Sequence, residues 1–425
     1  MKVLLISTNT EQINFLPLAL GLGCIAAATR RAGHDVRMID LMCENDSYVV
    51  ITDAIRDFSP DIIGMSVRNI DDQQEADMHF FLPPIRDVVE HCRTISDAPI
   101  VLGGAGYSIF PESSLAYLGA DMGIQGEGEI AFSMLLERLE KGSDLSGVPG
   151  LYLPGRGLQG ERVYSKDLDS LPLPDPRMWS FSNVRDRTFL IPVQTRRGCP
   201  MKCNYCSTGT IEGYPIRKRL PNAVVEWIAQ WVRAGLKEFA FVDNTFNLPA
   251  SYARELCRQI READLDISWR CIVYPKDVDD ELVTLMEQAG CKEVSLGFES
   301  GCEKIFTIMN KRFSLEDVQT VSKRFGDHGI RRIGFLLLGG PGETKETVEE
   351  SLAFVDALHL EEIHITVGVR IYPFTPLAKT AVEDGMLSPD DDLLIPRFYL
   401  VKELREWLAD TVDTWHKEQG DKNNF

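Results

Sequence analysis

Apolar strand-like segments alternate with helix-like segments along almost the whole chain, in two separate series. In the first series, residues 1–142, the expected strands cover residues 1–8, 35–41, 60–67, 98–104 and, with its glycine loop, 120–129. Helix-like segments at 16–33, 47–58 and 129–142 complete the alternation. Continuous apolar strands separated by helices are typical of a parallel sheet covered on both faces. We therefore predict an α/β protein that begins with a doubly wound, Rossmann-like domain.

The second series follows a stretch rich in proline and glycine. We interpret residues 143–188 as a linker with room for one small hairpin. Six strands are then expected, at 189–197, 237–243, 267–273, 293–300, 330–339 and 363–372, with helices between them. Six such units predict a partial (β/α)6 TIM-like barrel over residues 189–375, whose active site lies at the carboxyl ends of the strands. Residues 376–425 are expected to form a helical cap.

Charge and hydropathy limit the partners of the chain. The net charge is −19, and a strongly acidic surface repels phosphate backbones, so we expect no nucleic acid partner. No apolar run approaches the roughly 18 residues that a membrane helix needs. The first ten residues lack a secretion signal and are interpreted as a buried strand. We therefore expect a cytoplasmic protein with no membrane partner.

Three of the ten cysteines are clustered, within the sequence RRGCPMKCNYCSTG. Cys199, Cys203 and Cys206 directly follow the first barrel strand, so they are expected at the catalytic face. Three thiolates leave one iron of a [4Fe–4S] cluster without a protein ligand, free to bind a substrate. A zinc site is the alternative, but it normally takes four ligands, and no second cysteine pair or histidine lies nearby.

This cysteine spacing resembles the CxxxCxxC signature of the radical S-adenosylmethionine (SAM) superfamily. The resemblance implies that Cys199, Cys203 and Cys206 are both the metal ligands and the catalytic centre. It also implies a [4Fe–4S] cluster and SAM as cofactors, reductive cleavage of SAM to a 5′-deoxyadenosyl radical, and an external electron donor such as flavodoxin or ferredoxin.

Weaker motifs follow in the order that the superfamily shows, and they imply the SAM-binding residues. The segments EFAFVDNTFN, LGFES and GFLLLGGPGET resemble its second, fourth and fifth strands, and VGVRIYPFTPLA resembles the sixth. The implied SAM ligands are Tyr205, Asp243, Asn244, Glu299, Ser300, Gly339, Gly340 and Arg370. The acidic GGE form of the second-strand motif is absent, which leaves the contact to the SAM amino group open between Asp243 and Asn244.

The first domain resembles the cobalamin (B12)-binding domain that precedes the barrel in one radical SAM subclass. The resemblance rests on IIGMSVRNIDD, VLGGAGYSIFPE and GADMGIQGEGE, together with the first helix. It places cobalamin at the strand ends, with Thr8, Asn9, Ser66, Arg68, Asn69, Gly103, Gly104, Gly126 and Glu127 as its binding residues. The DxHxxG motif is missing, so cobalamin would have no histidine as its lower ligand. A scaffold that has lost the cofactor is the alternative.

With both cofactors present, the resemblance implies a methyltransferase. Its substrate would be a small molecule methylated at an unactivated carbon or a phosphinate centre. One alternative is a radical reaction without methyl transfer, such as a rearrangement, a cyclisation or transfer of another SAM fragment. A second is a non-catalytic sensor that uses the cluster or cobalamin. Methylthio transfer to tRNA is disfavoured, since the first domain lacks a second cysteine triad.

Overall fold

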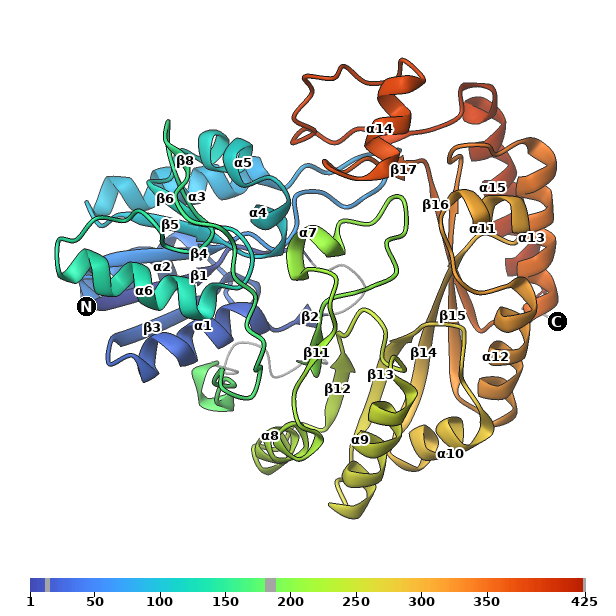
Figure 1. The fold of residues 1–425 in the computed structure, drawn as a ribbon, viewed down its shortest axis with the longest axis horizontal. Coiled ribbons are helices and arrows are strands. Elements are labelled where there is room, and N and C mark those ends of the chain that lie inside the picture. The colour runs from blue at the N-terminus through green and yellow to red at the C-terminus, as the bar shows by residue number, and fades with distance from the viewer. Residues whose placement is uncertain (12–15, 180–188, 423–425) are drawn as a thin grey trace.

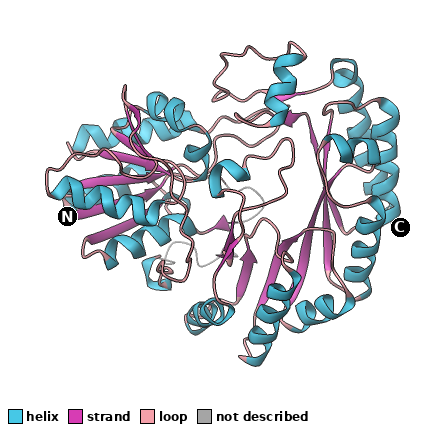
Figure 2. Ribbon diagram, viewed as in Figure 1, coloured by secondary structure: helices cyan, strands magenta, loops and turns pink. Residues whose placement is uncertain are grey.

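Two α/β lobes lie side by side in the computed structural model, which describes residues 1–11, 16–179 and 189–422 (Figure 1). Each lobe is built on a seven-stranded sheet. Helices cover the outer surfaces of both lobes, and loops fill the region where the lobes meet (Figure 2). The predicted α/β class is confirmed.

The first sheet has the strand order β3-β1-β4-β5-β6-β7-β8. Its strands are β1 (Lys2–Ser7), β3 (Asp35–Asp40), β4 (Ile62–Ser66), β5 (Ile100–Gly103), β6 (Met122–Ile124), β7 (Leu151–Leu153) and β8 (Gly157–Leu158). Strands β1, β3, β4, β5 and β6 pair in parallel. The β7–β8 hairpin, which lies in the range expected as linker, extends the sheet in antiparallel fashion.

Helices cover both faces of this sheet, as a doubly wound domain requires. Helices α1 (Leu20–Arg31) and α6 (Gly128–Glu140) pack together on one face. The other face carries α2 (Ser47–Phe58), α3 (Leu82–Ile95) and α5 (Pro111–Leu118). The short helices η1 (Leu41–Cys43) and α4 (Ala105–Ile109) follow β3 and β5. The carboxyl edge of the sheet, where β1, β4, β5 and β6 end, faces the second lobe (Figure 1).

The second sheet is all parallel, with the order β16-β15-β14-β13-β12-β9-β2. Its strands are β2 (Leu16–Pro17), β9 (Phe189–Val193), β12 (Glu238–Phe241), β13 (Ser268–Val273), β14 (Cys291–Glu299), β15 (Arg331–Leu338) and β16 (Glu362–Val367). Six of them are the predicted barrel strands in the predicted order. The seventh, β2, comes from the N-terminal part of the chain and pairs with β9.

Helices line the outside of this curved sheet (Figure 1). They are α8 (Pro221–Arg233), α9 (Ala250–Glu262), α10 (Asp280–Gln288), α11 (Glu303–Ile308), α12 (Leu315–Asp327) and α13 (Lys345–Leu358). Capping boxes at Ser314 and Thr344 satisfy the first backbone N–H groups of α12 and α13 and fix where these helices begin. Large aromatic side chains, among them Trp231 and Trp269, fill the core between helices and sheet.

The C-terminal segment joins the two lobes. It contains β17 (Val369–Arg370), α14 (Pro376–Glu383), β18 (Phe398–Tyr399), η3 (Lys402–Leu404) and α15 (Arg405–Lys422). Leu377 and Ala381 of α14 lie in the same apolar cluster as Val67 and Ile70 of the first lobe. The segment therefore packs against the first lobe as well as the barrel, with a largely non-helical stretch between α14 and η3.

The rest of the linker range holds η2 (Pro176–Met178), and its residues 180–188 lie outside the described part.

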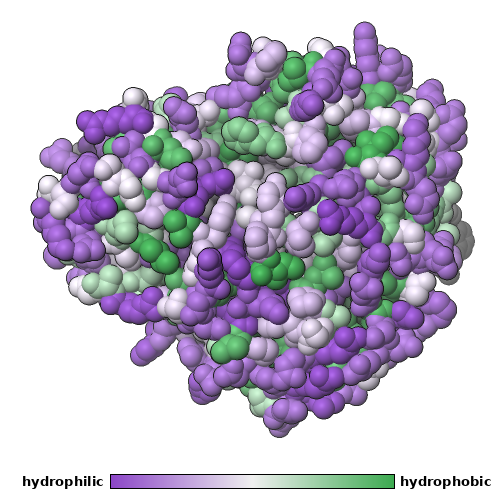
Figure 3. All heavy atoms as spheres, in the orientation of Figure 1, coloured by the Kyte–Doolittle hydropathy of each residue, from purple (hydrophilic) through white to green (hydrophobic). Residues whose placement is uncertain are grey.

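Hydrophilic side chains dominate the face seen in Figure 3, in line with the net charge of −19. Among the described residues, no helix combines the length and apolar character that crossing a bilayer would need.

Candidate functional site

The three clustered cysteines lie on a loop at the carboxyl end of the barrel sheet. The loop leaves β9, passes through β10 (Arg196–Arg197), forms the short helix α7 (Thr208–Glu212) and returns through β11 (Arg217–Lys218), which pairs with β10. Gly198 opens the loop at φ +93°, and a Cβ there would lie 2.2 Å from the Pro215 carbonyl oxygen. Only glycine fits this position, so the start of the cysteine loop is fixed sterically.

Hydrogen bonds hold the middle of this loop against two neighbouring elements. The Asn204 backbone N–H donates to the Met309 carbonyl at 3.1 Å, and its side-chain amide donates to Ile308 at 2.9 Å. The Asn204 carbonyl accepts from the Leu377 N–H at 3.0 Å. The loop is therefore fixed between the end of α11 and the start of α14.

The donor set of the loop fits an iron–sulfur cluster with one open iron. Cys199 and Cys203 are partly buried and Cys206 is exposed. Burial raises the pKa of the Cys203 thiol to about 11, and it also raises the pKa of Cys199. In the described part of the chain, no three His, Cys, Asp or Glu side chains converge as they would around a single metal ion. A four-iron cluster instead takes its thiolates at separate corners.

A partly buried triad lies next to the cysteine loop. The Lys311 ammonium donates to the Tyr205 hydroxyl at 3.0 Å, to the Gly297 carbonyl at 3.1 Å and to Glu299 Oε1 at 3.3 Å. Burial, together with the negative charge of Glu299, raises the pKa of Tyr205 well above its ordinary value. The structure thus brings together two predicted SAM-binding residues, Tyr205 and Glu299, through a lysine that the motifs did not identify.

The two candidates on the second strand differ in their surroundings. Asp243 is fully buried and accepts from the Thr195 N–H at 2.8 Å, the Thr195 hydroxyl at 2.6 Å and the Arg196 N–H at 3.1 Å. Asn244 is partly exposed, and its amide donates to Glu212 Oε2 at 2.7 Å. Asn244 is therefore the one of the two that remains open to a ligand.

The other predicted SAM-binding residues form hydrogen bonds or ion pairs with other groups of the protein. The Ser300 hydroxyl is buried and lies 3.0 Å from the Ser351 hydroxyl. The Gly340 N–H donates to Glu343 Oε2 at 2.9 Å, and the Gly339 N–H donates to the same atom. Arg370 is buried in an ion pair with Asp71. Their contact with SAM stays a prediction.

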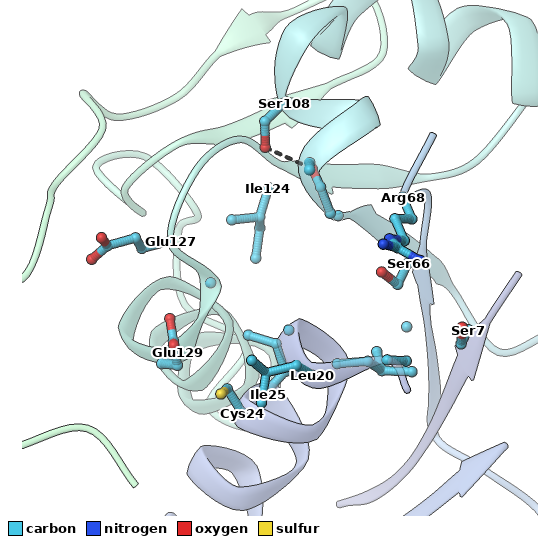
Figure 4. A pocket seen from close by; sticks show the side chains of 18 of the residues that line it. Ser7, Leu20, Cys24, Ile25, Ser66, Arg68, Ser108, Ile124, Glu127 and Glu129 are labelled. Atoms are coloured by element: carbon cyan, nitrogen blue, oxygen red, sulfur yellow. Dashed lines mark hydrogen bonds between the residues drawn. The ribbon is translucent and has the colours of Figure 1, made fainter. Parts of the chain in front are cut away.

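A cavity of about 440 Å³ lies between the carboxyl edge of the first sheet and the barrel (Figure 4). This volume lies within the ~300–1,000 Å³ of typical ligand sites. The predicted cobalamin-binding residues that line it are Asn9, Ser66, Arg68, Gly103, Gly104, Gly126 and Glu127. Thr8 and Asn69 do not line it; the Thr8 hydroxyl donates to the Ser66 carbonyl at 2.9 Å. The barrel contributes Pro192, Gln194, Arg197, Ile211, Glu212 and Val242.

Two features of this cavity suit a bulky ligand that approaches the backbone. Gly104 has φ +102°, and a Cβ there would lie 2.5 Å from the Val67 carbonyl oxygen. Ser108 accepts from the Gly126 N–H at 2.9 Å and donates to the Gly104 carbonyl at 2.7 Å, so one side chain ties together two glycine turns. None of the described residues that line the cavity is a histidine, in keeping with the missing DxHxxG motif.

Buried ion pairs connect the wall of this cavity to the cysteine loop. Arg197, two residues before Cys199, contacts Glu129 at 2.5 Å and Glu127 at 3.6 Å. Arg217 also pairs with Glu127. Burial alone would raise the pKa of Glu129, but the charge and hydrogen bonds of Arg197 hold it below its ordinary value. Glu129 therefore remains charged where α6 begins, paired with Arg197. Figure 4 shows Glu127 and Glu129 among the residues that line the cavity.

Sequence reasoning missed four residues of this site: Lys311, Glu212, Arg197 and Glu129. Arg197 and Glu212 flank the cysteine motif and belong to its immediate neighbourhood in the sequence. Glu129 belongs to the segment GEGE at the end of an expected strand, and this position could have identified it as a site residue. Lys311 lies in no motif considered, and only the folded chain brings it to Tyr205.

Comparisons with known proteins find a family match within each lobe. Residues 7–136 match the B12 binding domain family, and residues 193–355 match the radical SAM superfamily. An uncharacterized methyltransferase of Pyrococcus horikoshii is 28% identical over 91% of this chain and 84% of its own length. Cytidylyl-2-hydroxyethylphosphonate methyltransferase of Streptomyces wedmorensis is 24% identical over 88% of this chain and 79% of its own length.

Solved structures share the fold of most of the chain. The radical SAM methyltransferase TsrM of Kitasatospora setae, with tryptophan and a SAM analogue bound, superimposes with a TM-score of 0.80. The sequences are 23% identical, and the match covers 90% of this chain and 76% of that one. The cobalamin-dependent radical SAM enzyme OxsB, with aqua-cobalamin bound, gives a TM-score of 0.79 at 17% identity, over 97% of this chain and 66% of that one.

Proposed function

Because the chain carries a B12-binding domain followed by a radical SAM domain, it belongs to the radical SAM superfamily, and we propose that it is a cobalamin-dependent methyltransferase. Three relatives that match 88% or more of its length are named as methyltransferases, which supports this assignment.

One structural observation supports the proposal most directly. The cavity at the glycine turns of the first lobe is closed on its other side by Gln194, Arg197 and Glu212, which flank the cysteine loop. A ligand held at the strand ends of the first lobe would therefore lie beside a ligand held at the cysteine loop. Two cofactors that act on one substrate need this proximity, because reaction depends on aligned groups held close together.

The chain's own residues would hold and enclose these groups. Cys199, Cys203 and Cys206 would ligate the cluster, and the cavity lined by Ser66, Gly104 and their neighbours would hold the corrinoid. When bound, the cluster supplies the electron that cleaves SAM, and cobalamin supplies a methyl carrier.

The surrounding polar groups position the reactants. Lys311 holds the Tyr205 hydroxyl and the Glu299 carboxylate in one hydrogen-bonded group beside the loop. The Arg197–Glu129 and Arg217–Glu127 ion pairs fix the two lobes relative to each other.

The proposed substrate is a small molecule with an unactivated carbon or a phosphinate centre. Two relatives are named for methyl transfer to tryptophan and to cytidylyl-2-hydroxyethylphosphonate, so this domain pair serves chemically different small substrates. An external one-electron donor such as flavodoxin or ferredoxin would supply the electron. The acidic surface, with a net charge of −19, argues against a nucleic acid substrate.

The test uses full-length protein purified anaerobically and reconstituted with iron, sulfide and cobalamin. We expect about four irons and about one cobalt per chain after gel filtration. With SAM labelled in its methyl group and a strong reductant, we expect S-adenosylhomocysteine and 5′-deoxyadenosine, with the label in the corrinoid fraction. Protein that binds iron but no cobalt, and forms deoxyadenosine without S-adenosylhomocysteine, would support a radical reaction without methyl transfer. Protein that forms neither product would support the sensor.

A further inference from the structure

Basic side chains gather beside the cysteine loop, although the chain as a whole has a net charge of −19. They are Lys202 on the loop itself, Lys276 after β13, and Arg312 between α11 and α12. Lys202 and Arg312 are exposed, and Lys276 is partly exposed. We refer to these three residues as the basic patch.

Hydrogen bonds bring the three segments of the basic patch together. The Asn310 side-chain amide donates to the Lys202 carbonyl at 2.7 Å. The Lys276 ammonium donates to the Arg312 carbonyl at 3.2 Å, and Arg312 is only two residues beyond Asn310. Since Lys202 directly precedes Cys203, the patch is fixed against the loop that carries the proposed cluster ligands.

The basic patch carries positive charge that the protein does not neutralise. Among the described residues, none of its three members forms an ion pair with an acidic side chain. The neighbouring Lys311, by contrast, pairs with Glu299. In a chain with 64 acidic and 45 basic residues, a cluster of unpaired basic residues favours a negatively charged partner.

Two further features are typical of a contact surface. The Lys202 ammonium lies over the half-exposed Tyr214 ring, 5.1 Å from its centroid, so an aromatic side chain adjoins the charges. Tyrosine is enriched at protein interfaces because its ring is apolar and its hydroxyl is polar. Lys202 also has φ +56°, a left-handed conformation that is uncommon for a residue with a side chain and that is concentrated at functional sites.

The position of the basic patch indicates the kind of partner. A protein bound there would lie against the cysteine loop, and electron transfer slows steeply with distance. Redox complexes are small and short-lived, and opposite charges steer and orient the two proteins. Because this chain is acidic overall, an acidic donor would be repelled over most of the molecule and attracted at the patch.

We propose that the basic patch, together with Tyr214, is the docking surface for an acidic one-electron carrier protein that reduces the cluster. One electron leaves the carrier and enters the cluster, and no bond forms between the two proteins. In a flavin carrier, the anionic hydroquinone then becomes the neutral semiquinone. This inference rests on the proposed function, because it assumes an iron–sulfur cluster at the cysteine loop.

The first test measures binding without turnover. Oxidised flavodoxin is titrated onto the cluster-reconstituted full chain, and the Kd is measured by calorimetry at low and at high salt. The patch variant, Lys276→Glu with Arg312→Glu, should raise the Kd by about tenfold or more at low salt, because attraction becomes repulsion. At about 0.5 M salt, screening should reduce the difference to about twofold.

Lys292→Glu with Lys417→Glu is the matched control. It reverses the same number of charges on exposed lysines that lie elsewhere, at the amino end of β14 and on α15. The control should keep the Kd within about threefold of wild type, since only the overall charge has changed. A control as weak as the patch variant would overturn the assignment to the basic patch.

Two reductants then separate docking from the chemistry of the cluster. With flavodoxin hydroquinone at limiting concentration, the patch variant should be reduced about tenfold or more slowly than wild type, as followed by the electron paramagnetic resonance signal of the reduced cluster. Reduced methyl viologen is a small cation that needs no docking surface, so it should reduce both proteins at similar rates. Equal iron and sulfide contents establish that the cluster is intact in each protein.

The remaining outcomes distinguish this inference from the proposed function. Equal flavodoxin binding by wild type and patch variant, or no binding by wild type at low salt, would overturn the inference alone. A patch variant that viologen also reduces slowly would show that these residues support the cluster and do not dock a donor. Salt-dependent binding of a single-stranded oligonucleotide, lost in the patch variant and without flavodoxin binding, would assign the surface to nucleic acid. Wild type that viologen cannot reduce at all would overturn the proposed function itself.

Discussion

Arg370 and Asp71 lie 299 residues apart in the chain, and their side chains form a buried ion pair with an Nε–Oδ2 distance of 2.9 Å. The same guanidinium donates to the carbonyls of Ile371 at 2.6 Å and Leu393 at 3.0 Å. The rings of Phe110 and Tyr372 lie within 6 Å of its charge. One arginine at the end of the barrel thus anchors a loop of the first lobe and the C-terminal segment.

We predict that Asp71→Ala lowers the free energy of unfolding by about 3 kcal/mol, because it leaves a buried guanidinium without its counter-charge. Replacing both partners, by Asp71→Leu with Arg370→Met, should recover most of the loss. Glu75→Ala in the same loop removes the partner of the half-exposed Arg405 and should cost less than about 1 kcal/mol. Denaturant titration followed by tryptophan fluorescence measures all three; equal losses for Asp71→Ala and Glu75→Ala would contradict the prediction.

Cys203→Ala should abolish SAM cleavage, because two thiolates cannot hold the cluster that supplies the electron. The expected result is iron content reduced to near background after anaerobic reconstitution and no 5′-deoxyadenosine. Cys92→Ala, which alters a buried cysteine in the core of the first lobe, should retain the iron and the cleavage. Full turnover by Cys203→Ala would refute the cluster assignment.

Glu129→Gln should uncouple the two cofactor sites. The change removes the nearer of the two carboxylates that pair with Arg197, and with it a buried ion pair between the cavity wall and the cysteine loop. We expect methylated product per deoxyadenosine to fall by about tenfold or more, since methyl transfer depends on alignment between the lobes and SAM cleavage does not. Glu137→Gln lies on the same helix, is exposed, and should leave the ratio unchanged. A parallel fall of both products would show that Glu129 acts on the cluster alone.

The fold was predictable because its strands are buried on both faces. Segments such as Ile100–Gly103 and Met122–Ile124 form apolar runs between helices, and that pattern specifies a parallel sheet. Strand β2 (Leu16–Pro17) has only two residues and no periodicity, so its membership of the barrel sheet could not be foreseen. The β7–β8 hairpin was expected, but its pairing with β6 depends on tertiary contacts.

The site was predictable where its residues are consecutive in the chain. The cysteines share one loop, and their spacing alone predicts a metal ligand set. Neighbouring residues at a strand end point in opposite directions, so a motif cannot tell which of Asp243 and Asn244 faces the ligand. Lys311 and Glu129 reach the site from distant elements, and no local pattern records such contacts.

Stability should fall as the pH rises through the neutral range, because of Glu343. Glu343 is 3% exposed, and burial raises its pKa to about 7. The backbone N–H groups of Gly339 and Gly340 donate to the carboxylate and lower the pKa, but burial has the larger effect. Between the ordinary pKa of 4.5 and about 7, the folded protein holds a proton that the unfolded chain has lost, so unfolding becomes easier as pH increases. The full effect is about 3 kcal/mol between pH 5 and pH 8.

Glu343→Gln isolates this contribution. Glutamine resembles the protonated acid, and its amide nitrogen takes the place of Oε1, which has no hydrogen-bond partner. The variant should therefore be more stable than wild type at pH 8 and equal to it at pH 5. Identical pH profiles for the two proteins, recorded by denaturant titration, would show that Glu343 is charged in the folded state at neutral pH.

Gly104→Ala should impair cobalamin binding, and the reason is steric. At φ +102° a Cβ would lie 2.5 Å from the Val67 carbonyl oxygen, so this turn, which lines the cavity, must shift. Gly33→Ala is the matched control, since Gly33 has φ +93° and open space around the added methyl group. Both changes incur the strain of a left-handed backbone, about 1 kcal/mol or more, but only the first displaces the cavity wall.

We expect cobalamin affinity, measured from the visible absorbance retained after gel filtration, to fall by about tenfold or more for Gly104→Ala alone. Equal retention by both variants would mean that the corrinoid does not approach this turn.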